Sequence, residues 1–173
     1  MSVLRAVMVL VALAGSAGAV LADPPDRGGD SPMVLLRGSS FVVAPMFDGM
    51  LKEFLRSSET MRSQYYRITS APRLRVRIGL MLSKPVDRSA QTEFSRSPSG
   101  ELEARVSIAT PLRSMEYAEM LAHEFEHILE QIEGQDLGPG GSGGGIRLAD
   151  GAFETERARR AGREAAAEVE GAR

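Results

Sequence analysis

Apolar side chains recur at helical spacing in the segment that follows the first forty residues. Between Ala44 and Tyr66, charged residues such as Lys52 and Glu53 separate the apolar positions. A repeat of three to four residues places such positions on one face of a helix. The pattern therefore predicts a single amphipathic helix over this range. Its apolar positions are Met46, Met50, Leu51, Phe54, Leu55 and Met61.

Two later segments, Arg73 to Leu82 and Glu101 to Thr110, alternate between apolar and polar residues. A period of two is typical of a strand with one face in water. We therefore expect two short strands, which could pair with each other in an antiparallel sheet. The polar residues 84–100 between them predict no element. The alternating apolar positions are Leu74, Val76 and Ile78 in the first strand, and Leu102, Ala104, Val106 and Ile108 in the second.

Two further helices are expected in the second half of the chain. Residues from Ser114 to Glu133 contain neither Gly nor Pro and carry an apolar stripe, and Gly134 is a typical helix stop. The glycine-rich residues 138–145 predict a flexible loop. An Ala/Glu/Arg segment from Asp150 to Arg173 predicts a last helix, with Asp150 as its N-cap. Together these elements predict an α+β fold.

The N-terminal residues predict export from the cytoplasm. Residues 1–22 combine one early arginine, an apolar run and small residues before Asp23, which is typical of a cleaved signal peptide. The apolar run is shorter than the roughly 20 residues that span a membrane, so we expect cleavage and no stable membrane insertion of the mature chain. Residues 23–32 are rich in Pro and Gly and predict a disordered linker. We therefore expect a single domain over residues 33–173 in a periplasmic or secreted protein.

Composition narrows the chemistry that this domain could carry. Hydrophobic residues make up 43% of the chain, which is enough to bury a core, and the net charge of -2 does not favour binding to nucleic acid. The chain has no cysteine, which excludes thiolate nucleophiles and cysteine-bound zinc. Any protein ligands to a metal would be His, Asp or Glu.

Both histidines of the chain lie four residues apart in the predicted helix 114–133. This spacing puts His123 and His127 on one helix face, where both rings can reach one ion. Glu124 follows the first histidine, about 100° round the helix, where it can reach a metal-activated water without binding the metal. The sequence His-Glu-x-x-His is the pattern in which the glutamate acts as general base for such a water.

These residues resemble the active-site helix of the HExxH zinc metallopeptidases, the zincins, and the chain is most similar to the gluzincin type. The resemblance implies a small zincin-like domain, a Zn²⁺ cofactor and hydrolysis of a peptide or protein substrate. It also implies a sheet whose edge strand aligns an extended substrate, for which residues 101–110 are the candidate. The chain departs from the usual pattern at two positions. Glu126 puts a charge directly before the second histidine, and Met120 stands three residues before the first histidine, where the pattern prefers a small or aliphatic residue.

A catalytic zinc site has three protein ligands, so a carboxylate must join the histidines. Glu133 has the spacing of a metzincin third ligand, but Glu130 stands where that pattern needs a glycine, and we reject it. Glu154 falls on the small-residue face of the last predicted helix, so we expect it to be the ligand. Glu156 is the second candidate, and Arg157 could contact the ligating carboxylate.

Three interpretations remain open. The first is an exported zinc metallopeptidase with His123, His127 and Glu154 as metal ligands and Glu124 as general base. The second is an exported metal-binding protein without catalytic turnover. The third is a helical protein whose two histidines bind no metal.

Tyr117 lies on the far side of the helix from His123 and is expected in the core.

Overall fold

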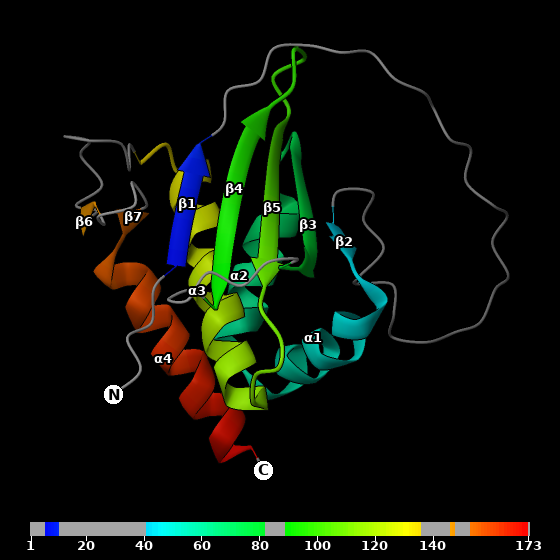
Figure 1. The fold of residues 1–173 in the computed structure, drawn as a ribbon, viewed down its shortest axis with the longest axis vertical. Coiled ribbons are helices and arrows are strands. Elements are labelled where there is room, and N and C mark those ends of the chain that lie inside the picture. The colour runs from blue at the N-terminus through cyan, green and yellow to red at the C-terminus, as the bar shows by residue number, and fades with distance from the viewer. Residues whose placement is uncertain (1–5, 11–40, 82–88, 136–145, 148–152, 173) are drawn as a thin grey trace, which may run out of the picture.

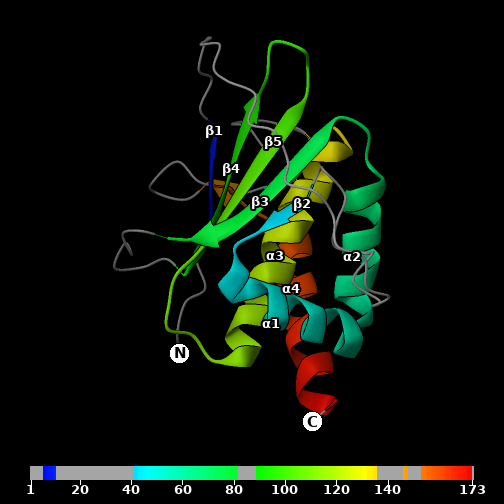
Figure 2. The same ribbon diagram turned by 90° about the vertical axis from the view of Figure 1, so that its right-hand side faces the viewer.

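Helices cover one face of a mixed β-sheet (Figures 1 and 2). The computed structural model describes residues 6–10, 41–81, 89–135, 146–147 and 153–172. The predicted linker 23–32, the glycine-rich residues 138–145, Asp150 and most of the predicted signal peptide lie outside the described residues. No helix in the described part of the chain is long and apolar enough to cross a membrane.

The sheet has a core of four strands in the order β4, β5, β3, β2. The strand β1 adds to the free side of β4, and β6 and β7 form a separate small sheet. The pairs β4–β5 and β6–β7 are antiparallel, whereas β1–β4, β2–β3 and β3–β5 are parallel. The strands are β1 (Ala6–Leu10), β2 (Phe41–Val43), β3 (Leu74–Leu80), β4 (Ala90–Arg96), β5 (Leu102–Ile108), β6 (Ile146–Arg147) and β7 (Phe153–Glu154).

The two strands expected from alternation are present as β3 and β5, and they pair with each other. Their pairing is parallel, so the expected antiparallel arrangement is wrong for this pair. The strand β4 was not predicted, although Ala90, Thr92 and Phe94 alternate inward along it. Because β4 lies beside β5, the strand expected at the sheet edge is an interior strand.

The single helix expected over residues 44–66 is two helices, α1 (Pro45–Ser57) and α2 (Glu59–Ser70). The break falls at Ser58, whose backbone is extended and whose hydroxyl accepts a 3.0 Å hydrogen bond from the amide of Met61. A serine in this position caps the second helix at its N-terminus. The apolar repeat continues across the break because both helices bury one face against the same core.

The helix α3 (Ser114–Ile132) is the centre of the structure. It contacts β4 and β5 on one side and α2 and α4 on others (Figure 2). Its range confirms the predicted helix, and Gly134 after it has the positive φ of +72° that suits a glycine helix stop. Tyr117 is buried with its ring edge against Phe47, as expected for a core residue.

The C-terminal helix α4 (Glu156–Gly171) packs along α3 (Figure 1). It starts later than expected: Thr155 is its N-cap, and the Thr155 hydroxyl accepts a 3.0 Å hydrogen bond from the amide of Ala158. Small residues on the packed face let the two helices approach closely. A Cβ added to Gly162 would lie 2.7 Å from the carbonyl oxygen of Glu119. The other small residues buried on this face are Ala158, Ala161 and Ala165.

Candidate metal centre

The two histidine rings meet inside the protein. His123 and His127 project from the same face of α3 and are completely buried. Their Nε2 atoms lie 3.1 Å apart, and the rings stand edge to face. The helical spacing of four residues therefore brings two imidazole nitrogens to one point, as the sequence predicts.

The carboxylate of Glu154 meets the two rings. Its Oε1 atom lies 3.3 Å from Nε2 of His123, and only 1% of the side chain is exposed. Tetrahedral zinc with bonds of about 2.0–2.1 Å separates neighbouring ligand atoms by about 3.3–3.4 Å. The ligand atoms of the three residues all lie within 4.8 Å of one another. The group could therefore hold a divalent metal ion.

Glu154 reaches this position from an element that was not expected. It lies in the short strand β7, one residue before the cap of α4, and not on a helix face. The helical projection that selected it was therefore wrong about the local backbone. It still grouped Glu154 with alanines that do face α3, because the residue that precedes a helix cap can lie beside the buried face of that helix.

The alternative third ligands point elsewhere. Glu156 is exposed on the first turn of α4, where its Oε1 atom accepts a 2.7 Å hydrogen bond from Arg163. Glu133 is the C-cap of α3 and pairs with two arginines, Arg67 and Arg157. Neither carboxylate belongs to the group of candidate ligands in the described part of the chain.

The contact between Arg157 and Glu154 that the sequence suggested is not formed. The guanidinium of Arg157 binds Glu126 and Glu133 instead. Glu154 is faced by Arg159, whose Nε atom lies 3.7 Å from Oε2. Burial raises the pKa of Glu154, and the charges of His127 and Arg159 oppose that rise.

Glu124 lies next to the group and is completely buried. Its Oε2 atom accepts a 2.6 Å hydrogen bond from the hydroxyl of Thr92 on β4, and its Oε1 atom has no hydrogen-bond partner among the described residues. Burial raises the pKa of Glu124 to about 7, against the effects of His127 and of the Thr92 hydrogen bond. One carboxylate oxygen is thus held in place while the other is free to accept a proton.

The two imidazoles differ in their surroundings. Nδ1 of His127 lies 2.9 Å from Oε2 of Glu130, whereas Nδ1 of His123 has no hydrogen-bond partner among the described residues. Burial and the charges of His127 and Arg159 lower the pKa of His123 well below its usual value. Burial alone would lower the pKa of His127 too, but the hydrogen bond to Glu130 and the nearby carboxylates raise it.

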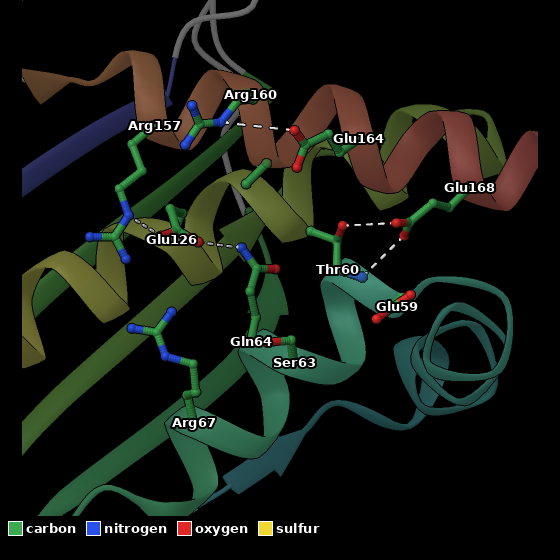
Figure 3. A pocket seen from close by; sticks show the side chains of 11 residues that line it. Glu59, Thr60, Ser63, Gln64, Arg67, Glu126, Arg157, Arg160, Glu164 and Glu168 are labelled. Carbon is green, nitrogen blue, oxygen red and sulfur yellow. Dashed lines mark hydrogen bonds and ion pairs between the residues drawn. The ribbon is translucent and has the colours of Figure 1, made fainter.

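Glu126, the charged residue that departs from the zincin pattern, has partners of its own. Figure 3 shows it between Gln64 of α2 and Arg157 of α4, at one side of a polar cleft of about 430 Å³. The amide of Gln64 donates a 2.7 Å hydrogen bond to Oε2 of Glu126, and Arg157 binds Oε1. This residue therefore ties three helices together and does not face the histidine rings.

Sequence reasoning missed Thr92, Glu130 and Thr155. Thr92 belongs to the strand that was not expected, although its place in the alternation Ala90, Thr92, Phe94 was a usable signal. Glu130 stands three residues after His127, a helical spacing at which two side chains meet. The contact between Glu130 and Thr155 joins residues far apart in the chain, so nothing in the local pattern predicted it.

No protein-family model matches the chain, and neither a curated protein nor a solved structure is significantly similar to it.

Proposed function

We propose that this protein is an exported zinc metallopeptidase of the gluzincin type. In this proposal His123, His127 and Glu154 hold the zinc ion, and Glu124 is the general base. The observation that carries the proposal is the buried group of three ligand atoms, in which the 3.1 Å distance between the two histidine Nε2 atoms and the 3.3 Å distance from His123 to Glu154 are close to those between ligands of tetrahedral zinc. Glu124 beside that group provides the proton acceptor that hydrolysis needs.

The cost of burying these side chains supports a metal. Moving an ionisable or polar side chain out of water costs free energy unless it gains a partner. Oε2 of Glu154 is buried without a hydrogen-bond partner among the described residues, and its nearest opposite charge there is the Nε atom of Arg159, at 3.7 Å. A divalent cation bound between the rings and the carboxylate would offset that cost, because its charge and its bonds replace the lost hydration.

The reaction we propose is hydrolysis of a peptide bond. His123, His127 and Glu154 would hold the ion, which would supply Lewis-acid chemistry by polarising the peptide carbonyl and lowering the pKa of water. Glu124 accepts a proton from the attacking water and passes it to the nitrogen of the leaving amine, which restores the carboxylate. Thr92 holds Glu124 by its Oε2 atom, which leaves Oε1 to accept that proton.

The edge of β4 supports an extended peptide as substrate. In the described structure β1 pairs with this edge, from Ala6 opposite Ala90 to Leu10 opposite Phe94, and it contacts β7 and α3 beside the metal group. These residues belong to the predicted signal peptide. Its removal would leave the backbone groups of β4 free to pair with another extended chain.

Glu124→Gln tests the enzyme proposal directly. The chain that begins at residue 23 would be incubated with zinc and an unfolded protein substrate, and new peptide ends would be counted by mass spectrometry. We expect Glu124→Gln to lower hydrolysis by about 10²-fold or more while zinc stays bound. Glu126→Gln is the matched control. It changes another buried glutamate of the same helix, but one that contacts Gln64 and Arg157 and not the histidine rings.

Other outcomes separate the alternatives. A wild-type chain that binds zinc but cleaves no substrate would favour the metal-binding protein without turnover. Equal hydrolysis by wild type and Glu124→Gln would contradict the role of Glu124.

A further inference from the structure

We propose that Glu130, together with Thr155, is a positioning residue for the metal centre. In this inference Glu130 fixes the ring of His127 and, through Thr155, the segment that carries Glu154. The inference rests on the proposed function, because it assigns these residues a task in assembling that zinc site.

Both oxygens of Glu130 are engaged inside the protein. The side chain is buried, with 1% of it exposed. Its Oε2 atom lies 2.9 Å from Nδ1 of His127, one helical turn earlier. Its Oε1 atom accepts a 2.7 Å hydrogen bond from the hydroxyl of Thr155. One carboxylate therefore connects α3 to the start of α4.

The contact with His127 decides which ring nitrogen can bind a metal. An ionised carboxylate only accepts hydrogen bonds, so Nδ1 of His127 must carry the proton. In the neutral ring Nε2 then keeps its lone pair, and this atom faces His123. A carboxylate behind a histidine also makes the ring a stronger ligand. Glu130 thus prepares His127 for metal binding before the metal arrives.

The contact with Thr155 acts on the third ligand. Thr155 follows Glu154 directly, and its backbone amide donates a 3.0 Å hydrogen bond to Oε1 of that residue. The Thr155 hydroxyl is also the N-cap of α4. When Glu130 holds this hydroxyl, it fixes the distance between the strand with Glu154 and the helix with the histidines. A purely structural tie between helices would not need the contact with His127.

Glu130→Gln tests the inference, with Glu126→Gln as the matched control. Zinc affinity would be measured by competition with a chromophoric chelator, on the chain from residue 23. We expect Glu130→Gln to weaken zinc binding about 10- to 100-fold and Glu126→Gln to leave it nearly unchanged. Equal affinity in wild type and Glu130→Gln would overturn the inference. Equal losses in both variants would also overturn it, because they would indicate a general effect of helix packing.

The ring of His127 provides a readout that packing alone would not move. With two histidines in the chain, the ¹⁵N chemical shifts of both rings can be followed in the zinc-free protein. We expect one ring to be in the Nδ1–H form in wild type and to lose that preference in Glu130→Gln. Unchanged ring shifts in a folded variant would contradict the inference.

Substitutions of Thr155 give a second test that does not alter Glu130. Thr155→Val removes the hydroxyl, and Thr155→Ser keeps it. We expect weaker zinc binding in the valine variant and near wild-type affinity in the serine variant. Equal affinity in both variants would overturn the role of Thr155. If the wild-type chain itself binds no zinc, the proposed function fails first, and the inference fails with it.

Discussion

At the residue scale, an unusual feature of this structure is the burial of acidic and basic side chains on one helix. Five of them on α3 are nearly or fully buried, and a charged group in such a place needs a partner. Two carboxylates meet this need with protein partners, Glu126 with Gln64 and Arg157, and Glu130 with Thr155. The other three, His123, His127 and Glu124, lie together at the candidate metal centre. The five residues are His123, Glu124, Glu126, His127 and Glu130.

The hydroxyl of Thr92 gives a prediction about Glu124. Thr92→Val keeps the shape of the side chain but removes the 2.6 Å hydrogen bond. A hydrogen bond to a charged group contributes about 1.5–3 kcal/mol, so we expect hydrolysis to fall about 10- to 100-fold. Zinc content should not change. Thr92→Ser should restore most of the rate, and a valine variant with the wild-type kcat/KM would contradict this role.

The sequence predicts some of these residues and not others, for a physical reason. A helix fixes the relative directions of residues one turn apart, so His123, His127 and Glu124 could be placed from spacing alone. Thr92 and Thr155 meet their glutamates across 32 and 25 residues of chain. Such contacts depend on tertiary packing, which local periodicity does not encode.

At the element scale, the close approach of α3 and α4 sets the position of the third ligand. Gly162 lies where the two helices are in close contact, because a Cβ there would meet the backbone of Glu119 at 2.7 Å and Cβ of His123 at 3.4 Å. A backbone carbonyl cannot rotate away as a side chain can. Any added atom would therefore push α4, and Glu154 with it, away from the histidines.

Gly162→Ala should therefore destabilise the protein and weaken zinc binding together. Overpacking of this kind costs about 1–3 kcal/mol, which urea unfolding would measure. Gly49→Ala in α1 is the matched control, because nothing lies within 4 Å of its added Cβ. Alanine is the better helix former, so we expect the control to be stable or slightly stabilised. A Gly162→Ala variant as stable as wild type would contradict the close packing.

A second contact between elements gives a prediction on pH. The carboxylate of Glu168 on α4 accepts hydrogen bonds from the Ser58 hydroxyl at 2.5 Å and from the amide and hydroxyl of Thr60 at 3.1 and 3.0 Å. Burial alone would raise the pKa of Glu168, but these bonds lower it below its ordinary value. A pKa lowered by folding adds stability above the unfolded value and loses it as the pH falls through the folded value.

Glu168→Gln should therefore destabilise the protein at pH 7 more than at pH 3. Urea unfolding of wild type and variant at both pH values would measure the two differences. Glu170→Gln, on an exposed position of the same helix, should behave as wild type at both. A destabilisation by Glu168→Gln that is equal at pH 7 and pH 3 would contradict a role for the ionised carboxylate.

Elements were predictable where the pattern was long and regular. The range of α3 and the strands β3 and β5 followed from their periods. The break at Ser58 was missed because the apolar repeat continues through it, and β4 because polar residues dominate its surroundings. A cap or a short strand is decided by a few hydrogen bonds, which change the pattern of apolar residues very little.

At the scale of the whole molecule, the candidate metal centre lies where three parts of the chain meet. The strand β4 supplies Thr92, α3 supplies the histidines and Glu124, and β7 supplies Glu154. The α+β class followed from the sequence, whereas the order of the strands did not. The pairing of β3 with β5 around the β4–β5 hairpin depends on contacts between distant segments.

The zinc content of the chain that begins at residue 23 is the most direct test of the account. Elemental analysis would compare wild type with Glu154→Ala and Glu156→Ala. The two glutamates are two residues apart in the chain, but Glu154 is buried and Glu156 is exposed. We expect about one zinc per chain in wild type and Glu156→Ala, and a marked loss in Glu154→Ala. A wild-type chain without zinc, or full zinc content in Glu154→Ala, would contradict the site proposed from His123, His127 and Glu154.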